Sequence, residues 1–301
     1  DGSAWYQGNA DAVRQNMRHI LQADFEHILI LSGDQLYRMD YAELLSYHVD
    51  RKASVTVAVL PVPRSAASAL GILQLDDERR IVRFEEKPKD KRILDELAVP
   101  QRVKAGLGLD EEENYCLASM GIYLFNLESL EKALDNDMAD FGGEIIPQSI
   151  SGGSTYGYPF NGYWEDVGTI RTFFEANLAL CSSRPSFDFF EPSAPIYTRA
   201  RFLPSSKILD TCITSSLIAD GCVIKGARIE ESLVGVRSFI NEETTIRHSI
   251  LMGCDFYESV NQELKYDDMG IPHLSIGRGC HIERAIIDKN AHVGDKVTIN
   301  D

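Results

Sequence analysis

Two patterns of apolar residues divide the chain. In the first part, helical spacing alternates with short apolar runs: apolar side chains between Val13 and Leu21 recur on one face of a helix, and residues 28–31 form a continuous apolar run. Such a run is typical of a strand buried on both faces of a parallel sheet. The alternation predicts an α/β fold with a mixed, largely parallel sheet covered by helices.

Similar patterns place the remaining elements of this part. We expect further strands at residues 55–60, 71–75, 81–84 and 120–126, and further helices near residues 41–49, 128–134, 143–150 and 170–181. The charged, weakly patterned segment 89–115 is expected to be a surface insertion.

The second pattern is a repeat in the last hundred residues. Single aliphatic residues recur in steps of five and six, so that alternate members are 17 residues apart: Val223 and Ile240, Ile229 and Ile246, Val234 and Leu251, Ile276 and Val293, Ile282 and Ile299. Three short strands per coil, each pointing one aliphatic side chain inward, predict a parallel β-helix. A β-sandwich would alternate at period two instead. Glycines are expected to form its corners: Gly221, Gly226, Gly235, Gly277, Gly279 and Gly294. Residues 252–275 break the repeat and should project as a loop.

A stretch rich in Pro, Ser and Phe separates the two patterns. We therefore predict a first domain over residues 1–184, a linker over 185–204 and a β-helix domain over 205–301. The net charge of -16 argues against binding to nucleic acid, and no apolar run approaches the length that spans a membrane. Six widely spaced cysteines without a CxxC pair indicate reduced thiols, and no signal peptide is visible, so a cytoplasmic protein is expected.

Two aspartates carry the strongest chemical signal. Asp34 follows the apolar run and Ser32-Gly33, where ligands of open α/β sheets bind, and Asp166 lies in GYWEDVGT just before Gly168-Thr169. Together they can supply two oxygen ligands to one Mg²⁺. The alternative for Asp34 alone is a turn residue that bonds its own backbone.

Three weaker signals accompany the aspartates. In WYQGNADAV, Gly8 allows a flat base to approach the backbone, and Gln7 can read its donors and acceptors. In FEEKP, Lys87 can meet a phosphate while Glu86 accepts sugar hydroxyls. Ser119 at a strand entrance can add a hydroxyl contact. Taken singly, a plain helix start and a solvated strand end explain the first two signals as well.

In combination these motifs resemble a known family. WYQGNADAV, LSGDQLYRMDY, FEEKP, SMGIY, DFGGEIIP and YWEDVGT, followed by a β-helix, look like the glucose-1-phosphate adenylyltransferase (ADP-glucose pyrophosphorylase) family over almost the whole chain. The resemblance implies a Rossmann-like nucleotidyltransferase domain and a left-handed parallel β-helix. It also implies synthesis of ADP-glucose and pyrophosphate from ATP and glucose 1-phosphate with Mg²⁺, for glycogen or starch.

The resemblance assigns roles residue by residue. It implies Asp34 and Asp166 as Mg²⁺ ligands and, with Lys87, as the catalytic residues; Glu86, Lys87, Ser119 and Trp164 at the sugar phosphate; and Trp5, Gln7 and Gly8 at the nucleotide. It further implies a homo- or hetero-tetramer regulated by an anionic effector, located in a plastid if the source is a plant or alga. Arg199 and Arg201 are candidates for the effector, although arginines after a linker are often plain interface residues. Asn9 stands where the family usually has Thr, and little effect is expected.

The glycine-rich loop GGxGxRLxPLT with which this family begins does not occur here, so we expect the chain to be a fragment of a longer protein and incomplete at the nucleotide. Two related alternatives remain: a non-catalytic regulatory subunit of the same enzyme, or a pyrophosphorylase for another nucleotide sugar. A hexapeptide acyltransferase using His248, His281 or His292 would leave the motifs of the first domain without use.

Overall fold

The computed structural model describes residues 5–22, 24–101, 103–104, 109–110 and 112–300. Contacts divide the chain into two compact units. The first unit contains the residues up to Gly33 and Met39–Gly162, and the second contains Asp34–Arg38 and everything from Tyr163 onward. The short segment Asp34–Arg38 therefore belongs, by its contacts, to the unit that also holds the C-terminal coil.

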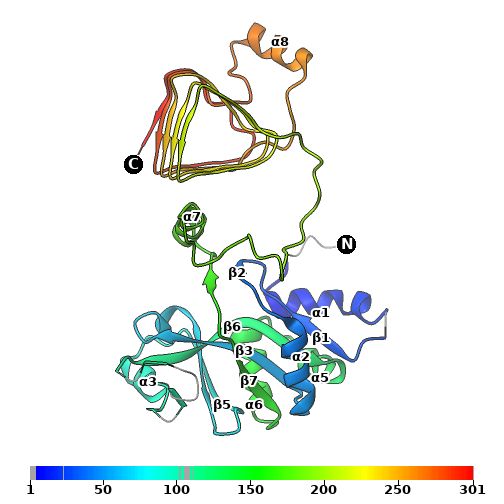
Figure 1. Cartoon of the computed structure of the whole chain (residues 1–301). Coiled ribbons are helices and arrows are strands. Elements are labelled where there is room, and N and C mark those ends of the chain that lie inside the picture. The colour runs from blue at the N-terminus through cyan, green and yellow to red at the C-terminus, as the bar shows by residue number, and fades with distance from the viewer. Residues whose placement is uncertain (1–4, 23, 102, 105–108, 111, 301) are drawn as a thin grey trace. The chain divides into compact units, whose positions relative to one another are not determined.

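The first unit is built on a mixed sheet with helices packed against it (Figure 1). Its strands are β1 (His27–Ile30), β3 (Val55–Pro63), β4 (Gly71–Leu75), β5 (Ile81–Glu86), β6 (Tyr115–Asn126) and β7 (Thr155–Pro159). Its helical elements are α1 (Asn9–Ile20), α2 (Tyr41–Asp50), η1 (Ala67–Ala69), α3 (Lys91–Glu96), α5 (Leu127–Leu134), η2 (Phe141–Ile145) and α6 (Ile146–Ile150). The strand order is β5-β4-β6-β3-β7, with β1 also paired to β6.

The mixed character of this sheet was predicted, but its pairing differs from the expectation of mostly parallel strands. Within this sheet, as far as the structure describes it, only β3 and β7 pair in parallel, whereas β1·β6, β3·β6, β4·β5 and β4·β6 are antiparallel. The apolar run in β1 led to the parallel expectation, yet all four residues of β1 are half-buried. A continuous apolar run indicates that both faces of a strand are covered by other residues. It does not indicate whether the neighbouring strand runs parallel or antiparallel.

Strand β6 is irregular at the point where it approaches the candidate site. Val57 of β3 pairs with Tyr123 and Val59 pairs with Ser119, so β6 carries extra residues at this place. Gly121, in the middle of this bulge, has φ +67°, which glycine adopts without steric cost. Bulges bend a strand and redirect its side chains.

The segment expected to be a surface insertion contributes to the core. Within residues 89–115, of which 102, 105–108 and 111 lie outside the described residues, α3 forms after Asp90, whose side chain accepts the Arg92 N–H. Leu94, Leu97 and Val99 are buried, the first two in a cluster around η1 and β4. The prediction rested on the high charge of the segment, in which these few apolar core positions are not apparent.

The second unit contains a short two-stranded ladder, helix α7 and a coil of parallel strands. Strands β2 (Gln35–Tyr37) and β8 (Trp164–Asp166) pair antiparallel, and α7 (Ile170–Ala179) follows. The coil strands are β9 (Lys207–Leu209), β10 (Cys212–Thr214), β11 (Leu217–Ile218), β12 (Val223–Lys225), β13 (Arg228–Glu230), β14 (Leu233–Val234), β15 (Phe239–Ile240), β16 (Thr245–Arg247), β17 (Ile250–Leu251), β18 (His281–Glu283), β19 (Ile286–Ile287) and β20 (Thr298–Ile299). They stack into three parallel sheets, one on each side of a triangular coil (Figure 1).

The repeat predicted the register of this coil with one error. Ile229 pairs with Ile246, and Val234 with Leu251, as their 17-residue spacing indicated. At Val223 the expectation is wrong, because Val223 pairs with Phe239 and it is Ile224 that pairs with Ile240. Ile224 is fully buried in the coil's core, whereas Val223 is only half-buried.

The corners of the coil use left-handed backbone, although less often through glycine than expected. Corner residues with positive φ stack in columns, such as Asp210, Gly226, Glu243, Gly279 and Lys296. Thus several non-glycine residues accept this conformation. Gly235 and Gly277 serve a different purpose, since a Cβ on either would lie 2.5 Å from a backbone carbon of the neighbouring coil.

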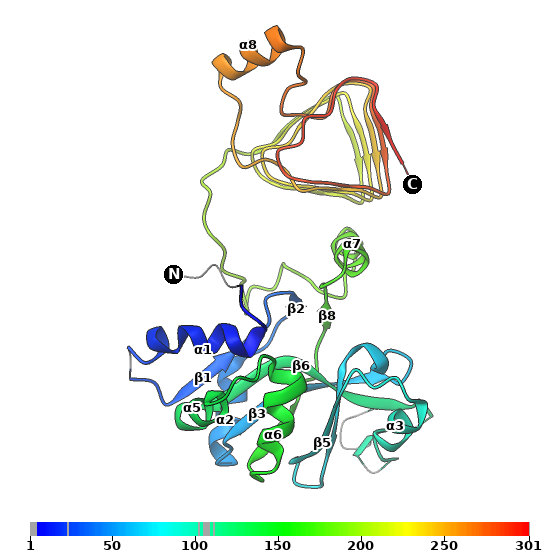
Figure 2. The same ribbon diagram turned by 180° about the vertical axis from the view of Figure 1, so that it is seen from behind.

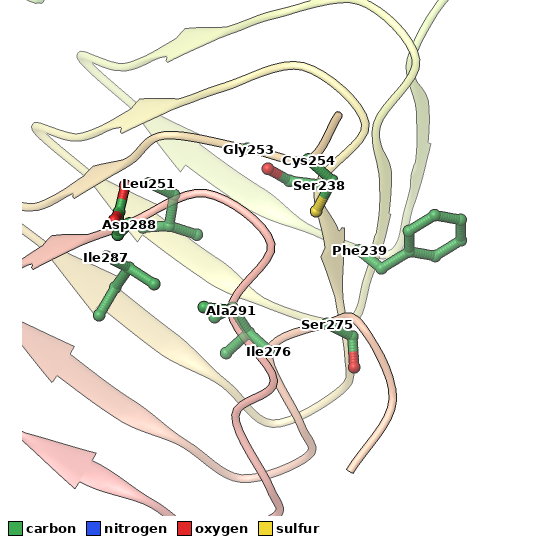
Figure 3. A pocket seen from close by; sticks show the side chains of 10 residues that line it. All are labelled: Ser238, Phe239, Leu251, Gly253, Cys254, Ser275, Ile276, Ile287, Asp288 and Ala291. Carbon is green, nitrogen blue, oxygen red and sulfur yellow. The ribbon is translucent and has the colours of Figure 1, made fainter. Parts of the chain in front are cut away.

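The break in the repeat contains a helix and is not only a loop. Helix α8 (Val260–Met269) lies in the segment 252–275, begins with a capping box at Ser259 and ends at Gly270, which has φ +62°. It projects from one corner of the coil (Figure 2). Beside this corner, the coil has a small, partly open pocket lined mainly by apolar side chains (Figure 3). The ring of Phe239 points away from it, and burial raises the pKa of the Cys254 thiol, which lines it.

His273 bonds to two acidic side chains of this insertion. His273 Nδ1 lies 3.2 Å from Glu258 Oε2, and its Nε2 lies 3.1 Å from Asp267 Oδ1 on α8; His292 Nδ1 is 3.9 Å from Glu258 Oε1. Burial of the His273 ring disfavours its protonated form, but the bonds to Glu258 and Asp267 outweigh this and raise the pKa of His273.

We expect the bonds of His273 to Glu258 and Asp267 to stabilise the insertion less as the pH rises. The stabilisation is complete below the unfolded pKa of histidine, ~6.5, and is lost as pH rises through the higher folded pKa. Hydrogen-exchange protection of residues 258–274, corrected for intrinsic rates, should fall across this window, and His273→Gln should remove the pH dependence. His248→Gln, on a coil corner, is the control. An unchanged pH profile in His273→Gln would contradict the assignment.

Candidate functional site

The two predicted acids lie on one ladder of the second unit. Gln35 pairs with Asp166, and Tyr37 pairs with Trp164. Beyond the end of this ladder, the Val167 N–H donates to the Asp34 carbonyl at 3.0 Å. The pairing therefore places Asp34 and Asp166, which are far apart in sequence, at the same end of two adjacent strands.

Their carboxylates converge at Gly168. A Cβ built on this glycine would lie 2.9 Å from Asp166 Oδ1 and 3.1 Å from Asp34 Oδ2. The Gly168 N–H donates to Asp166 Oδ1 at 2.8 Å, which fixes that carboxylate. Both aspartates are exposed. Two like charges facing the same small space repel each other unless a cation lies between them.

This pair fits a divalent cation that is completed by other ligands. Mg²⁺ commonly binds one or two carboxylates together with substrate phosphates and water. Within the residues that the structure describes, no group of three or more His, Cys, Asp or Glu side chains could hold a metal. The two aspartates thus suit a metal that is shared with a phosphorylated substrate, and they do not form a closed protein site.

Buried polar atoms surround the ladder. Burial, followed by the nearby charges of Glu175 and Asp166, raises the pKa of Glu165. Trp164 Nε1 and Gln35 Oε1 are buried, and neither has a hydrogen-bond partner among the described residues. Unsatisfied buried donors and acceptors are costly, and they are found at sites where a ligand supplies the missing partner.

A second group of predicted residues gathers on the first unit, at the end of β5. Lys87 has φ +46°, a left-handed conformation that is uncommon for a side chain of this kind, and its N–H donates to the Leu70 carbonyl at 3.1 Å. Its Nζ lies 3.6 Å from Glu86 Oε1. Both side chains are exposed enough to meet a ligand. Backbone strain of this type is often stored at functional sites.

The bulge of β6 adds hydroxyl groups beside Glu86. Ser119 hydrogen-bonds to Tyr123, and a Cβ at Gly142 would lie 3.2 Å from Glu86 Oε2, 3.4 Å from Asp140 Oδ1 and 3.7 Å from the Tyr123 hydroxyl. Burial, together with the charges of Asp140 and Glu86, raises the pKa of Tyr123 to about 12, so its hydroxyl stays protonated near neutral pH. Carboxylates and neutral hydroxyls around a glycine form a surface suited to a polyhydroxylated ligand.

The predicted nucleotide segment is tied to this second group through its backbone. A Cβ at Gly8 would lie 2.9 Å from the carbonyl carbon of Ala139, and Asn9 Oδ1 accepts the Phe141 N–H at 2.8 Å. The Asn9 departure therefore has a structural use. By contrast, Trp5 is 90% exposed and Gln7 bonds only locally, to Asp11 and Trp5. The structure does not bring these two side chains into a formed pocket among the described residues.

The remaining candidates, two arginines before the coil and two histidines on it, lie in the second unit. Arg199 and Arg201 are exposed and lie outside helices and strands. His248 pairs with Glu231, and His281 Nε2 lies 3.5 Å from Glu283 Oε2, on the surface of the coil. Sequence reasoning missed Tyr123 and Asp140, although both lie in quoted motifs, SMGIY and DFGGEIIP. Their role depends on the bulge and on the turn before η2.

No helix within the described ranges is long and apolar enough to cross a membrane.

Comparison with known proteins bears on both units. A family model described as nucleotidyl transferase matches residues 3–183, and one described as the GLGC left-handed parallel β-helix domain matches residues 201–301. A wheat (Triticum aestivum) protein, the chloroplastic/amyloplastic small subunit of glucose-1-phosphate adenylyltransferase, is 44% identical over 308 residues. The match covers 99% of this chain and 64% of the relative, so the chain spans less than two thirds of that protein's length. The left-handed β-helix expected from the sequence is confirmed, whereas the boundaries at residues 184 and 205 stay predictions.

Proposed function

Because this chain belongs to the nucleotidyltransferase family, we propose that it forms part of a glucose-1-phosphate adenylyltransferase, which converts ATP and glucose 1-phosphate into ADP-glucose and pyrophosphate. The observation that carries the proposal is the convergence of the Asp34 and Asp166 carboxylates at Gly168. The wheat relative favours adenine as the base and glucose as the sugar. Intact acids and Lys87 favour a catalytic subunit over a regulatory one.

The chemistry needs charge neutralisation more than an activated nucleophile. The sugar phosphate is already ionised near neutral pH, so no His or Cys base is required. Repulsion between this anion and the triphosphate must be overcome instead. Asp34 and Asp166 would hold Mg²⁺, which supplies positive charge to the reacting phosphates. Lys87 would neutralise the sugar phosphate and position it for in-line attack.

The first unit's polar groups would select the sugar. Glu86 can accept hydrogen bonds from sugar hydroxyls, and the Tyr123 hydroxyl, protonated at neutral pH, can donate one. Ser119 adds a hydroxyl that serves either role. Trp164 would lie beside the sugar, and Trp5, Gln7 and Gly8 would lie at the nucleotide.

An assay with different nucleotides tests the proposal. The protein expressed from its complete reading frame should form ADP-glucose in the presence of Mg²⁺ and should prefer ATP over UTP, dTTP and GTP. A clear preference for another base would move the protein to a different branch of the family.

Lys87→Ala should mainly raise the KM for glucose 1-phosphate. The lysine contacts charge that is present in both the ground state and the transition state, so its loss affects binding more than turnover. Loss of one exposed charge–phosphate contact is worth about 1.5–3 kcal/mol, or roughly 10- to 150-fold in KM. Steady-state kinetics with Lys89→Ala as the matched control measures this. A fall in kcat without change in KM would contradict the role.

The name of the relative also bears on assembly and location. A small subunit implies a large one, so we infer a hetero-oligomer, most simply a tetramer, in a plastid, with Arg199 and Arg201 among the groups that meet an anionic effector. Light scattering of the protein alone and with a co-expressed partner subunit would measure the assembly. A monomer under both conditions would exclude it.

A further inference from the structure

The coil has a second line of apolar residues, on its outer surface. In strands β11, β14, β17 and β19, one residue of each pair points into the core, and its neighbour points outward. The outward residues stack in register and are called the outer ladder: Leu217, Leu233, Ile250 and Ile286. Such positions normally face water. Ile250 is only 2% exposed, yet it is not part of the core cluster that contains its neighbour Leu251.

Helix α7 packs against this ladder at β17. It contacts β17, the strand of Ile250, and lies alongside the coil in both views (Figures 1 and 2). Just after the helix, the Cys181 thiol lies 3.5 Å from the Ser232 carbonyl on the adjoining turn of the coil, and burial raises the pKa of this thiol. Ala176 of α7 is 7% exposed. The small side chain allows the helix to approach closely.

The other end of α7 begins at the acid pair. Thr169 caps the helix: its Oγ1 accepts the Thr172 N–H at 3.1 Å, and its own N–H donates to Thr172 Oγ1 at 3.2 Å. Gly168, immediately before this cap, donates to Asp166 and faces both carboxylates. A packed helix behaves as a rigid rod. One continuous path therefore runs from the outer ladder through α7 and its cap to Asp166.

We propose that the outer ladder, through Ile250, is a positioning element for the acid pair, which holds Asp166 at the spacing from Asp34 that a shared metal requires. The proposal rests on the proposed function, since it assumes that the pair binds the metal. Metal and catalytic sites tolerate displacements of only about 0.5 Å, so a small shift of α7 matters. The coil would then act on catalysis directly.

Ile250→Ala should weaken metal binding about 10-fold while leaving the KM for glucose 1-phosphate nearly unchanged. Mn²⁺ binding measured by electron paramagnetic resonance without substrates gives a readout that is independent of turnover. Hydrogen exchange at residues 167–173 should rise in parallel. Ile250→Val, which keeps most of the packing, should restore both. Leu251→Ala is the matched control, because it removes a similar side chain from the same strand but on the inner side.

Two further variants separate the possible outcomes. Thr169→Ala breaks the path at the helix cap without altering the coil, and should weaken Mn²⁺ binding as Ile250→Ala does, even if Ile250→Ala folds poorly. Asp34→Asn reports on the metal site itself: if it leaves Mn²⁺ binding intact, the proposed function fails. If Asp34→Asn abolishes binding while Ile250→Ala and Thr169→Ala do not weaken it, only the positioning role is overturned. Equal loss of Mn²⁺ affinity in Leu251→Ala would overturn it as well.

Discussion

Replacing Asp34 by Asn should lower turnover at least ~100-fold in a protein that remains folded. The substitution removes one of the two negative charges that converge at Gly168 and leaves the shape of the side chain intact. Electrostatic stabilisation of a charged transition state by such groups is worth about 2.7–4 kcal/mol, which corresponds to 10²–10³ in rate. Asp34 is exposed, so folding has little to lose.

Steady-state rates across a Mg²⁺ titration measure this effect on the protein expressed from its complete reading frame. Asp268→Asn, at an exposed position on α8, is a control of identical chemistry outside the site. Asp166→Asn should resemble Asp34→Asn, and the double variant should lose little more than either single one, because the acids act as a unit. Near-normal turnover in Asp34→Asn would make this aspartate an ordinary turn residue.

Gly253→Ala should destabilise the coil by more than about 3 kcal/mol. Gly253 has φ +84°, and a Cβ there would lie 2.7 Å from both the Val236 nitrogen and the Gly235 carbonyl carbon. The left-handed conformation alone costs a non-glycine residue about 1–2 kcal/mol. Because the nearby atoms belong to the backbone of the adjacent coil, the clash can be relieved only by separating two stacked coils.

Gly270→Ala separates these two contributions. Gly270 also has positive φ, +62°, and lies in the same insertion, but a Cβ there would meet nothing within 4 Å. It should therefore cost only the conformational term, about 1 kcal/mol. Urea denaturation of the whole chain, with hydrogen exchange to follow the coil separately from the first unit, compares the two variants. Equal losses would mean that close packing at the corner contributes nothing.

The coil was predictable because its pattern is periodic and local. Each strand is short, every turn repeats the last, and inward residues must be aliphatic to fill a narrow core. The error at Val223 arose where two aliphatic residues are adjacent, since Val223 and Ile224 satisfy the same pattern and only stacking on Phe239 and Ile240 decides between them. The helix within the insertion was missed because none of its residues is buried.

The acids were recognisable from sequence, but part of the sugar group was not. Asp34 directly follows Gly33 after the apolar run of β1, and Asp166, the last residue of β8, lies two residues before Gly168; both are local signals. Tyr123 and Asp140 meet Glu86 only because β6 bulges against β3 and because Asp140 caps the start of η2. Such features depend on pairing between distant segments. The predicted strand direction was wrong for the same reason. The apolar run of β1 can be read from its own residues, whereas the direction of β6 beside it cannot.

The 252–275 insertion leaves the stacking on both sides of it unchanged. Ile229 pairs with Ile246, and Ile246 pairs in the same inward register with Ile282, although the second step along the chain is far longer. The interior and the corners of the coil are therefore constrained differently. The inward residues must keep the spacing of the repeat, whereas the segment inserted at a corner can change in length or sequence at little cost to the stacking of the strands. Related proteins can therefore diversify what the coil displays to its surroundings without redesigning what holds it together.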